Sequence, residues 1–412
     1  MNDVRRIVAG RIVRGFADGF ISVLLAQYLT DLGFSPTQVG AIVTGTLLGS
    51  AALTLAFGFG AKRTTLGRLL VASCVLMGLT GVGFAAITSF WPLLVVAVVG
   101  TLNPTAGDVS VFLPTEQAFI ADRVADTART RAYAVYNVGG ALAGALGALL
   151  SAAPERIARA MDWQLTSVER VGFALYGVAA VAIFAMYRSI PRREAARSSR
   201  RADGECDTDG SQPSDRSLGA SRRLVLGLAA LFALDSAGGG FVVTSLLVLW
   251  LHLRFDMSRG RTAGVFFAAG VLGACSQLLA PMLADRIGLV RTMVFTHLPA
   301  NALLALAAFA PNAPTAVVLL LGRALFSQMD VPARQAFVMA VVPPRARATA
   351  SSITNVPRSL ASATTPLLAG ALLSRSDFGW PLLIAGVTKF TYDLLLLAAH
   401  RNTPEIQPSP ES

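Results

Sequence analysis

The sequence predicts an all-α integral membrane protein whose twelve transmembrane helices form two pseudo-symmetric six-helix bundles. Of the 412 residues, 54% are hydrophobic and only 14% are charged, and the mean hydropathy is +0.58. That is more apolar surface than a water-soluble core can bury. The chain also repeats itself, because residues 114–120 read PTEQAFI and residues 332–338, about half the chain length later, read PARQAFV. A repeat of this period indicates two equivalent bundles.

Twelve apolar stretches are long enough to serve as the transmembrane helices. A helix of about 20 residues crosses the roughly 30 Å hydrocarbon layer of a bilayer. By that measure the expected spans are residues 13–32, 38–59, 67–88, 91–121, 132–153, 170–188, 224–251, 262–283, 290–310, 315–341, 349–373 and 380–399. In the fourth span, Pro104 and Gly107 predict a kink or a broken turn, which lipid tolerates only where the backbone faces protein or water.

One long polar segment divides these spans six and six. Residues 188–223 are rich in Arg, Ser, Asp and Gly, a composition typical of a linker rather than of a packed core. We therefore expect bundles at residues 1–187 and 224–412, joined by a cytoplasmic linker.

The basic residues predict the orientation. With the N-terminus inside, most of the 35 Lys and Arg residues fall in cytoplasmic segments, as the positive-inside rule requires. Both termini are expected to be cytoplasmic in a multi-pass protein of a bacterial cytoplasmic (inner) membrane. Arg5, Arg6, Arg11 and Arg14 lead straight into a long apolar run without a small-residue cleavage site, so no cleavable signal is expected. The net charge of +11 then reflects orientation and attraction to anionic lipid, not nucleic-acid binding.

Catalytic and metal-binding patterns are absent from the sequence. The three Cys and three His residues are scattered, no nucleophile stands with its base, and no nucleotide-binding motif occurs. We expect no cofactor, no metal site and no enzyme activity, and an ATP-driven pump is disfavoured. Metalloid export through Cys74 and Cys275 is a further alternative, disfavoured because isolated thiols are more often buried hydrophobes.

The loop after the eighth span carries a specific motif. Residues 284–291 read ADRIGLVR, in which Asp285, Arg286, Gly288 and Arg291 resemble the loop signature of the Major Facilitator Superfamily. Twelve spans in two sets of six with a basic linker are similar to that family over the whole chain. Gly288 would permit a tight turn, and Asp285 could lie at a helix N-terminus. The two arginines could pair with acids across the bundle interface. The first half departs from the signature, with Lys62 in place of the acid.

The resemblance implies that spans one, four, seven and ten surround a central cavity. Charged side chains are costly inside a membrane, so those retained there are usually paired or line a wet path. An acid in such a cavity can bind a proton from one side and release it to the other. The alternative for the acids is static pairing with Arg11, Arg14 or Arg323, and for Arg358 an internal partner such as Asp330. The candidates for proton coupling or the cavity are Asp18, Asp108, Asp235, Asp330, Arg323 and Arg358.

Glu116 and Arg334 occupy equivalent places in the two repeats. By resemblance, spans four and ten approach each other at the cytoplasmic side, so these residues are candidates for a cytoplasmic gate. The alternative pairs Arg334 with Asp330 at i,i+4 and Glu116 with Arg123 or another basic loop residue.

Two further patterns favour structural roles. Lys389 and Asp393 stand i,i+4 on the last span, a spacing that fits mutual neutralisation. The small residues of 137–147 favour close helix packing, although they also resemble in part the glycine-rich signature of proton-coupled drug antiporters, without its Gly-Pro.

Together these features predict a secondary transporter that works by alternating access. We expect it to act as a monomer in the lipid bilayer and to couple protons to efflux of a small organic compound. Proton-coupled uptake of a small metabolite is the alternative. A non-transporting receptor or lipid scramblase on the same fold is the alternative of another class.

Overall fold

The structure, a computed structural model, describes residues 3–60, 65–105, 112–124, 126–190, 222–331, 333–334, 337 and 347–400. The chain falls into two compact units. Unit 1 comprises Met1–Gly33 and Gly45–Gln212, and unit 2 comprises Phe34–Thr44 and Pro213–Ser412. The predicted linker lies almost entirely outside the described residues, so its bounds stay a prediction.

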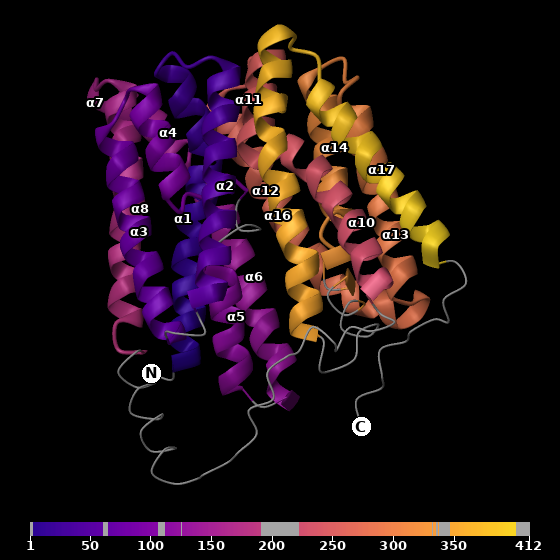
Figure 1. Cartoon of the computed structure of the whole chain (residues 1–412). Coiled ribbons are helices and arrows are strands. Elements are labelled where there is room, and N and C mark those ends of the chain that lie inside the picture. Colours follow the sequence, from indigo (N-terminus) through magenta and orange to yellow (C-terminus); the bar gives the residue numbers. More distant parts are fainter. Residues whose placement is uncertain are drawn as a thin grey trace. The chain divides into compact units, whose positions relative to one another are not determined.

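Unit 1 is a bundle of helices centred on α1. In this unit α1 packs along α6 and α8, and α3 packs along α8 (Figure 1). Its helices are α1 (Asp3–Asp31), the later part of α2 (Pro36–Gly60), α3 (Leu66–Ala86), α4 (Phe90–Val99), α5 (Phe112–Arg123), α6 (Asp126–Leu150), α7 (Ala153–Met161) and α8 (Leu165–Tyr187).

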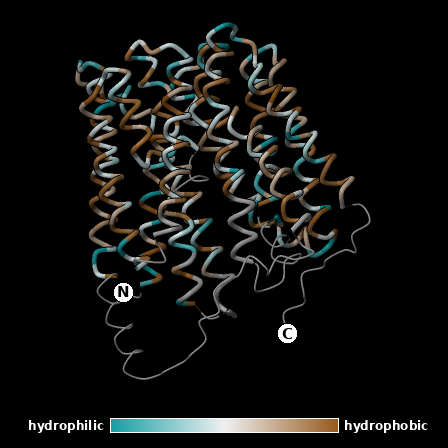
Figure 2. Tube along the Cα trace, viewed as in Figure 1, coloured by the Kyte–Doolittle hydropathy of each residue, from teal (hydrophilic) through white to brown (hydrophobic). Residues whose placement is uncertain are grey.

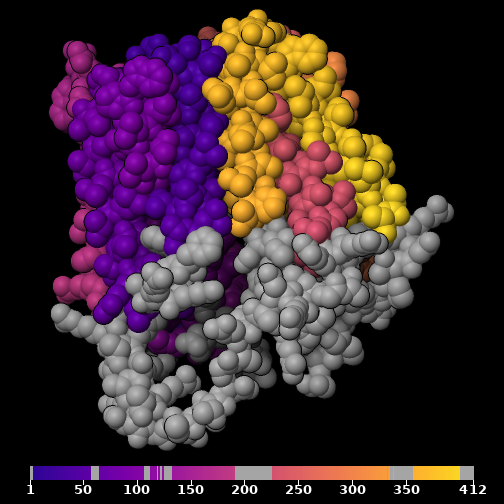
Figure 3. Space-filling view, viewed as in Figure 1, coloured from indigo at the N-terminus to yellow at the C-terminus, as the bar shows by residue number. Residues whose placement is uncertain are grey.

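Unit 2 is a second helical bundle, centred on α10. Here α10 packs against α16 and α17, and side chains of all three lie side by side on one face of the unit (Figure 3). Its helices are the first part of α2, α10 (Arg222–Phe241), α11 (Thr244–Phe255), α12 (Arg259–Ile287), α13 (Leu289–Ala307), α14 (Ala313–Phe326), α16 (Arg347–Arg375) and α17 (Trp380–His400).

These helices confirm the all-α membrane fold. Of the described helices, 7 are long and apolar enough to cross a membrane, and the bent pair α10–α11 makes up to 8. The 29-residue helices α1 and α16 are also long enough, but they carry several polar or charged residues. Hydrophobic positions recur along the helices of both units (Figure 2), and large apolar side chains such as Trp91 and Val318 are exposed, as lipid contact requires. With the interrupted spans, the described helices make six spans in each half.

Three expected spans are interrupted. Residues 91–121 divide because α4 ends at Val99, where Gly100 adopts an extended conformation, and α5 begins only at Phe112. Residues 224–251 bend by 41° between α10 and α11. Within 315–341, α14 ends at Phe326. The break predicted from Pro104 and Gly107 is therefore present, and the freed Thr101 amide donates to Thr80 Oγ1 at 3.2 Å.

Close glycine contacts join α1 to α6. A Cβ on Gly19 would lie 2.0 Å from the carbonyl oxygen of Gly144, and one on Gly147 would lie 2.0 Å from that of Phe16. Only a hydrogen at these positions lets the two backbones approach so closely. The packing role predicted for residues 137–147 is confirmed.

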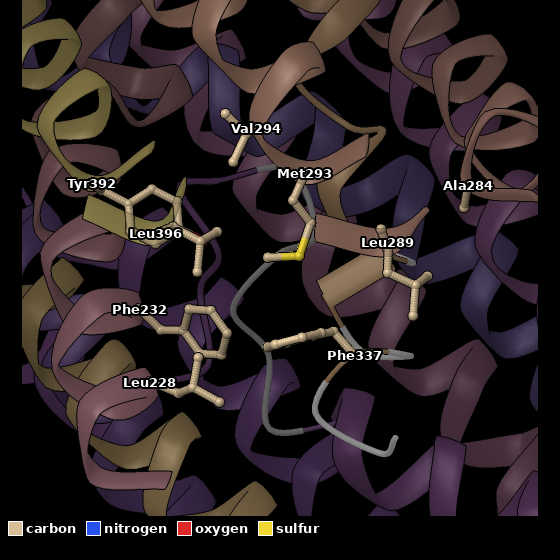
Figure 4. Packing of buried hydrophobic residues seen from close by; sticks show 10 residues of the cluster. Leu228, Phe232, Ala284, Leu289, Met293, Val294, Phe337, Tyr392 and Leu396 are labelled. Atoms are coloured by element: carbon tan, nitrogen blue, oxygen red, sulfur yellow. The ribbon is translucent and has the colours of Figure 1, made fainter. Parts of the chain in front are cut away.

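Unit 2 has a compact apolar cluster beside its polar residues. Phe232 of α10, Met293 of α13, Leu396 of α17 and Phe337 point toward one another (Figure 4) and are at most 1% exposed. This cluster fixes the relative positions of α10, α13 and α17, the three helices that carry Asp235, His297, Lys389 and Asp393.

Candidate functional site

An ion pair links α1 to α5 inside unit 1. Arg14 donates from Nη1 to Glu116 Oε1 at 2.5 Å and from Nη2 to Glu116 Oε2 at 2.8 Å. Both side chains are at most 1% exposed. Such a two-pronged arrangement is the strongest geometry for an arginine and a carboxylate. Arg123, the partner weighed for Glu116, pairs instead with Asp3.

Two tyrosines complete the surroundings of Glu116. Tyr136 of α6 donates to Glu116 Oε2 at 2.5 Å, and Tyr187 of α8 donates to Oε1 at 2.8 Å. The Arg14 guanidinium also lies 4.5 Å from the centre of the Phe112 ring. Glu116 therefore ties four helices of unit 1 together, which favours a structural role in this unit.

Asp18 lies one turn beyond Arg14 on α1 and is far less well satisfied. It is 1% exposed, and its Oδ2 atom makes no hydrogen bond among the described residues. Its nearest cation is Arg14 Nε, at 3.9 Å from Oδ2, and Tyr176 donates weakly to Oδ1 at 3.4 Å. Because Arg14 is engaged by Glu116, the static pairing considered for Asp18 is present only as a long contact.

Arg11 is a second buried base on α1. Its Nε and Nη1 atoms have no hydrogen-bond acceptor in the described part of the chain, and its guanidinium lies 5.5 Å from the centre of the Tyr136 ring. Counting Arg11 and Arg14 against Asp18 and Glu116, the cluster is neutral when Asp18 is ionised. Protonation of Asp18 would give it one positive charge.

In unit 2 the equivalent acid, Asp235 of α10, faces three basic side chains. Lys389 Nζ donates to Asp235 Oδ1 at 2.6 Å, and Arg334 Nη1 donates to Oδ2 at 3.3 Å. His297 Nε2 lies 3.8 Å from the same Oδ1 atom. Asp235 is therefore strongly held, in contrast to Asp18.

His297 of α13 also contacts Asp393 of α17. Its Nδ1 atom lies 2.9 Å from Asp393 Oδ1, and Asn301 Nδ2 donates to Asp393 Oδ2 at 2.8 Å. The expected neutralisation of Lys389 by Asp393 is wrong: each of the two side chains reaches across to another helix. Both are buried, at 8% and 0% exposure, so each contacts α10 or α13 and not its neighbour one turn away.

Arg334 joins two acids of unit 2. It lies 3.3 Å from Asp235 Oδ2 and 3.1 Å from Asp330 Oδ2, so the i,i+4 alternative weighed for Arg334 is present. The charges are thus reversed between the two units. In unit 1 a base on the first helix, Arg14, pairs with the acid Glu116, and in unit 2 an acid on the first span, Asp235, pairs with the base Arg334. The predicted gate between Glu116 and Arg334 would join the units and stays a prediction.

The remaining candidates are spread over the chain. Arg358 of α16 donates from Nε to Ser236 Oγ at 3.2 Å, which gives it an internal partner as predicted. Arg323 is half-buried on α14. Asp108 lies outside the described residues.

The loop signature lies between α12 and α13. Gly288 has φ +86°, which confirms the tight turn. Asp285 does not begin a helix as expected: α12 continues to Ile287, so Asp285 and Arg286 are exposed in its last turn. The turn forms at Gly288 because glycine alone tolerates that backbone conformation freely. Arg291 is exposed on α13.

Sequence reasoning missed the contacts of His297 and Asn301. Their i,i+4 spacing on one apolar span was the available signal, since two polar residues on one face of a membrane helix point inward. Among the described residues no group of three metal-binding side chains gathers. The two clusters hold acids, bases and a histidine, which can exchange protons but do not resemble a catalytic centre.

Known proteins resemble this chain over nearly its full length. The model of the Major Facilitator Superfamily matches residues 7–327. An uncharacterized membrane protein of Saccharomyces cerevisiae, YJR124C, is 24% identical, with 96% of this chain and 93% of the yeast protein covered.

Solved transporter structures share the fold. The D-xylose-proton symporter matches with a TM-score of 0.74 and 17% identity, covering 98% of each chain. A bacterial homolog of the human lysosomal transporter Spinster matches with a TM-score of 0.73 and 15% identity, covering 99% of this chain and 98% of that one. The nucleoside transporter NupG has a TM-score of 0.73 at 12% identity, covering 98% of this chain and 100% of its own. The chain belongs to the Major Facilitator Superfamily of membrane transporters.

Proposed function

We propose that this secondary transporter exports a small organic compound in exchange for protons. It would act as a monomer in a bacterial cytoplasmic membrane, with both termini cytoplasmic. Family membership makes the chain a multi-pass transporter and not an enzyme. Its direction, its coupling ion and its substrate class are the proposed parts.

The surroundings of Asp18 support proton coupling. A buried carboxylate with one oxygen outside any hydrogen bond is poorly stabilised as an anion, since burial disfavours the charged form. Arg14, the base closest to it, is already paired with Glu116 at 2.5 Å. A proton on Asp18 would supply the missing donor and change the charge of the cluster by one. Such a change can bias alternating access.

The composition of the candidate cavity spans is compatible with export. Acids and arginines there mix with many small apolar residues, which suits efflux of a modest-sized organic compound and would also suit import of a metabolite. The D-xylose-proton symporter shares the fold at 17% identity, so the fold itself accommodates symport with protons as well, and the experiment must separate export from uptake.

Asp18→Asn is expected to abolish proton-driven resistance. Asparagine keeps the shape of Asp18 but cannot take up and release a proton. Efflux-deficient bacteria expressing the wild type or the variant would be tested against antibiotics, dyes, organic acids and metalloids, at matched membrane levels. Resistance to some compounds should be lost in Asp18→Asn and in wild-type cells treated with a protonophore.

Asp31→Asn is the matched control. Asp31 is the exposed last residue of the same helix, so its neutralisation should leave resistance intact. Equal susceptibility of wild-type and empty-vector cells to every compound would contradict export, and accumulation of labelled metabolites would then test uptake. Undiminished protonophore-sensitive resistance in Asp18→Asn would remove this residue from the coupling mechanism.

A further inference from the structure

Unit 2 contains a buried histidine between two carboxylates, and this arrangement carries an inference beyond Asp18. His297 is 5% exposed, and its two ring nitrogens face different acids. Nδ1 lies 2.9 Å from Asp393 Oδ1, while Nε2 lies 3.8 Å from Asp235 Oδ1. We propose that Nε2 of His297 is a second proton-binding site of this transporter. Asp393 orients the imidazole ring, and Asp235 interacts with Nε2 once it is protonated.

Asp393 fixes the proton on Nδ1. Nδ1 lies 2.9 Å from a carboxylate oxygen and 3.1 Å from Asn301 Nδ2, and we assign its hydrogen to the carboxylate contact because that contact is shorter and its acceptor is charged. Asn301 Nδ2, which donates to the other oxygen at 2.8 Å, holds the carboxylate in position. In the neutral ring Nε2 then carries a lone pair, because only one ring nitrogen bears a hydrogen.

That lone pair points toward an anion. Nε2 lies 3.8 Å from Asp235 Oδ1, so in neutral His297 two acceptors face each other. A proton taken from the aqueous phase onto Nε2 forms an N–H bond and turns the contact into an attraction between imidazolium and carboxylate. The geometry thus leaves one defined place for one additional proton.

The charges around His297 balance without that proton. The groups that surround it and its partners are three acids and three bases, so the cluster is neutral with a neutral ring and singly positive with an imidazolium. Histidine is the side chain whose charge ordinarily changes between about pH 5 and 8, which makes it the group of this cluster suited to gain and lose a proton. The acids are Asp235, Asp330 and Asp393, and the bases are Arg334, Arg358 and Lys389.

The titratable groups facing His297 come from three parts of unit 2. Asp235 faces it from α10, Asp393 and Lys389 from α17, and Asp330 from the residues after α14. Tyr392 of α17 contributes its ring, which meets the imidazole edge-on with centroids 6.0 Å apart. These are the groups whose charges a proton on Nε2 would affect.

Protonation would redistribute the contacts of Asp235. Its Oδ1 atom already accepts from Lys389 Nζ at 2.6 Å, so an imidazolium on the same side competes with Lys389 for that oxygen. A weaker hold on Lys389 loosens α17 from α10, while a stronger contact draws α13 toward α10. Proton binding at one atom would thereby change the packing of three helices. The effect of this change on transport rests on the proposed proton coupling.

Nitrogen NMR of the intact transporter tests the site directly. The chain has three histidines, and replacing His252 and His400 with glutamine leaves His297 as the single one. His252 is exposed on α11, so its loss should leave transport unchanged. With ¹⁵N-labelled histidine in lipid nanodiscs, we expect a neutral ring protonated at Nδ1 near pH 8 and a doubly protonated ring near pH 5. Asp393→Asn should abolish the fixed tautomer.

The outcomes separate this site from the role of Asp18. A ring that stays neutral, or stays charged, across that pH range overturns the inference, whatever the transport assays show. If His297 titrates but Asp18→Asn retains full proton-driven transport, the coupling role of Asp18 fails and the His297 site stands. In transport assays, His297→Gln should retain exchange of substrate across the membrane. It should lose accumulation driven by the proton gradient, together with the pH dependence of that accumulation. Loss of both exchange and accumulation in a folded variant would contradict a role in coupling.

Discussion

Replacing Glu116 with glutamine is expected to destabilise the folded transporter by about 3–5 kcal/mol. The substitution keeps the size of the side chain and an acceptor for one tyrosine, but it leaves Arg14 as a buried charge. Arg14 is 1% exposed and in the wild type donates to both carboxylate oxygens of Glu116. Thermal unfolding of purified protein in a mild detergent, read by size-exclusion chromatography, would measure the loss.

Two comparisons make this result specific. The double variant Arg14→Met with Glu116→Gln removes both charges and should recover most of the stability, because a buried pair is costly chiefly when one partner is missing. Glu155→Gln breaks the pair with Arg159, whose side chain is 75% exposed, and should change stability by about 0–1 kcal/mol. A double variant less stable than Glu116→Gln would show that Arg14 does not need its charge partner.

Replacing Gly19 with alanine should separate α1 from α6. The added Cβ would lie 2.0 Å from the carbonyl oxygen of Gly144, and backbone atoms cannot move aside as a flexible side chain can. Overpacking of this kind costs about 1–3 kcal/mol and occasionally more. Unfolding temperature and the yield of monodisperse protein should both fall, and more severely in Gly19→Leu.

Gly227→Ala is the matched control. Gly227 lies on α10 with no atom within 4 Å of an added Cβ, so alanine should be tolerated or should stabilise the helix by about 0.5–1 kcal/mol. Equal stability of Gly19→Ala and Gly227→Ala would contradict the close approach of α1 and α6.

The fold could be predicted because hydrophobicity and duplication act over the whole chain. Spans such as 67–88 and 380–399 were predicted closely because each is a long, mostly apolar stretch that forms one continuous helix, although Lys389 and Asp393 lie within the second. The interruption after Val99 was indicated by Pro104, but the bend at Val242 and Val243 was not predicted. Three consecutive glycines, residues 238–240, directly precede the bend and were the available signal for a change of direction between α10 and α11.

The candidate site was predicted as a set of residues but not as pairs. Sequence identified Asp18, Glu116, Asp235 and Arg334, since any charge inside a span is conspicuous. Spacing along one helix could not show that Lys389 reaches Asp235 on α10 at 2.6 Å. Contacts between helices depend on rotation about each helix axis, which a single sequence without neighbours does not reveal.

Proton movement in everted membrane vesicles tests the central proposal most directly. Respiration acidifies the vesicle interior, and a compound identified in the resistance panel is then added outside, at the cytoplasmic face of the transporter. Proton-coupled export predicts that the compound enters while protons leave, so a fluorescent dye reports collapse of the pH difference for wild type and Asp31→Asn but not for Asp18→Asn. Accumulation of the compound by wild-type vesicles without any proton movement would contradict proton coupling.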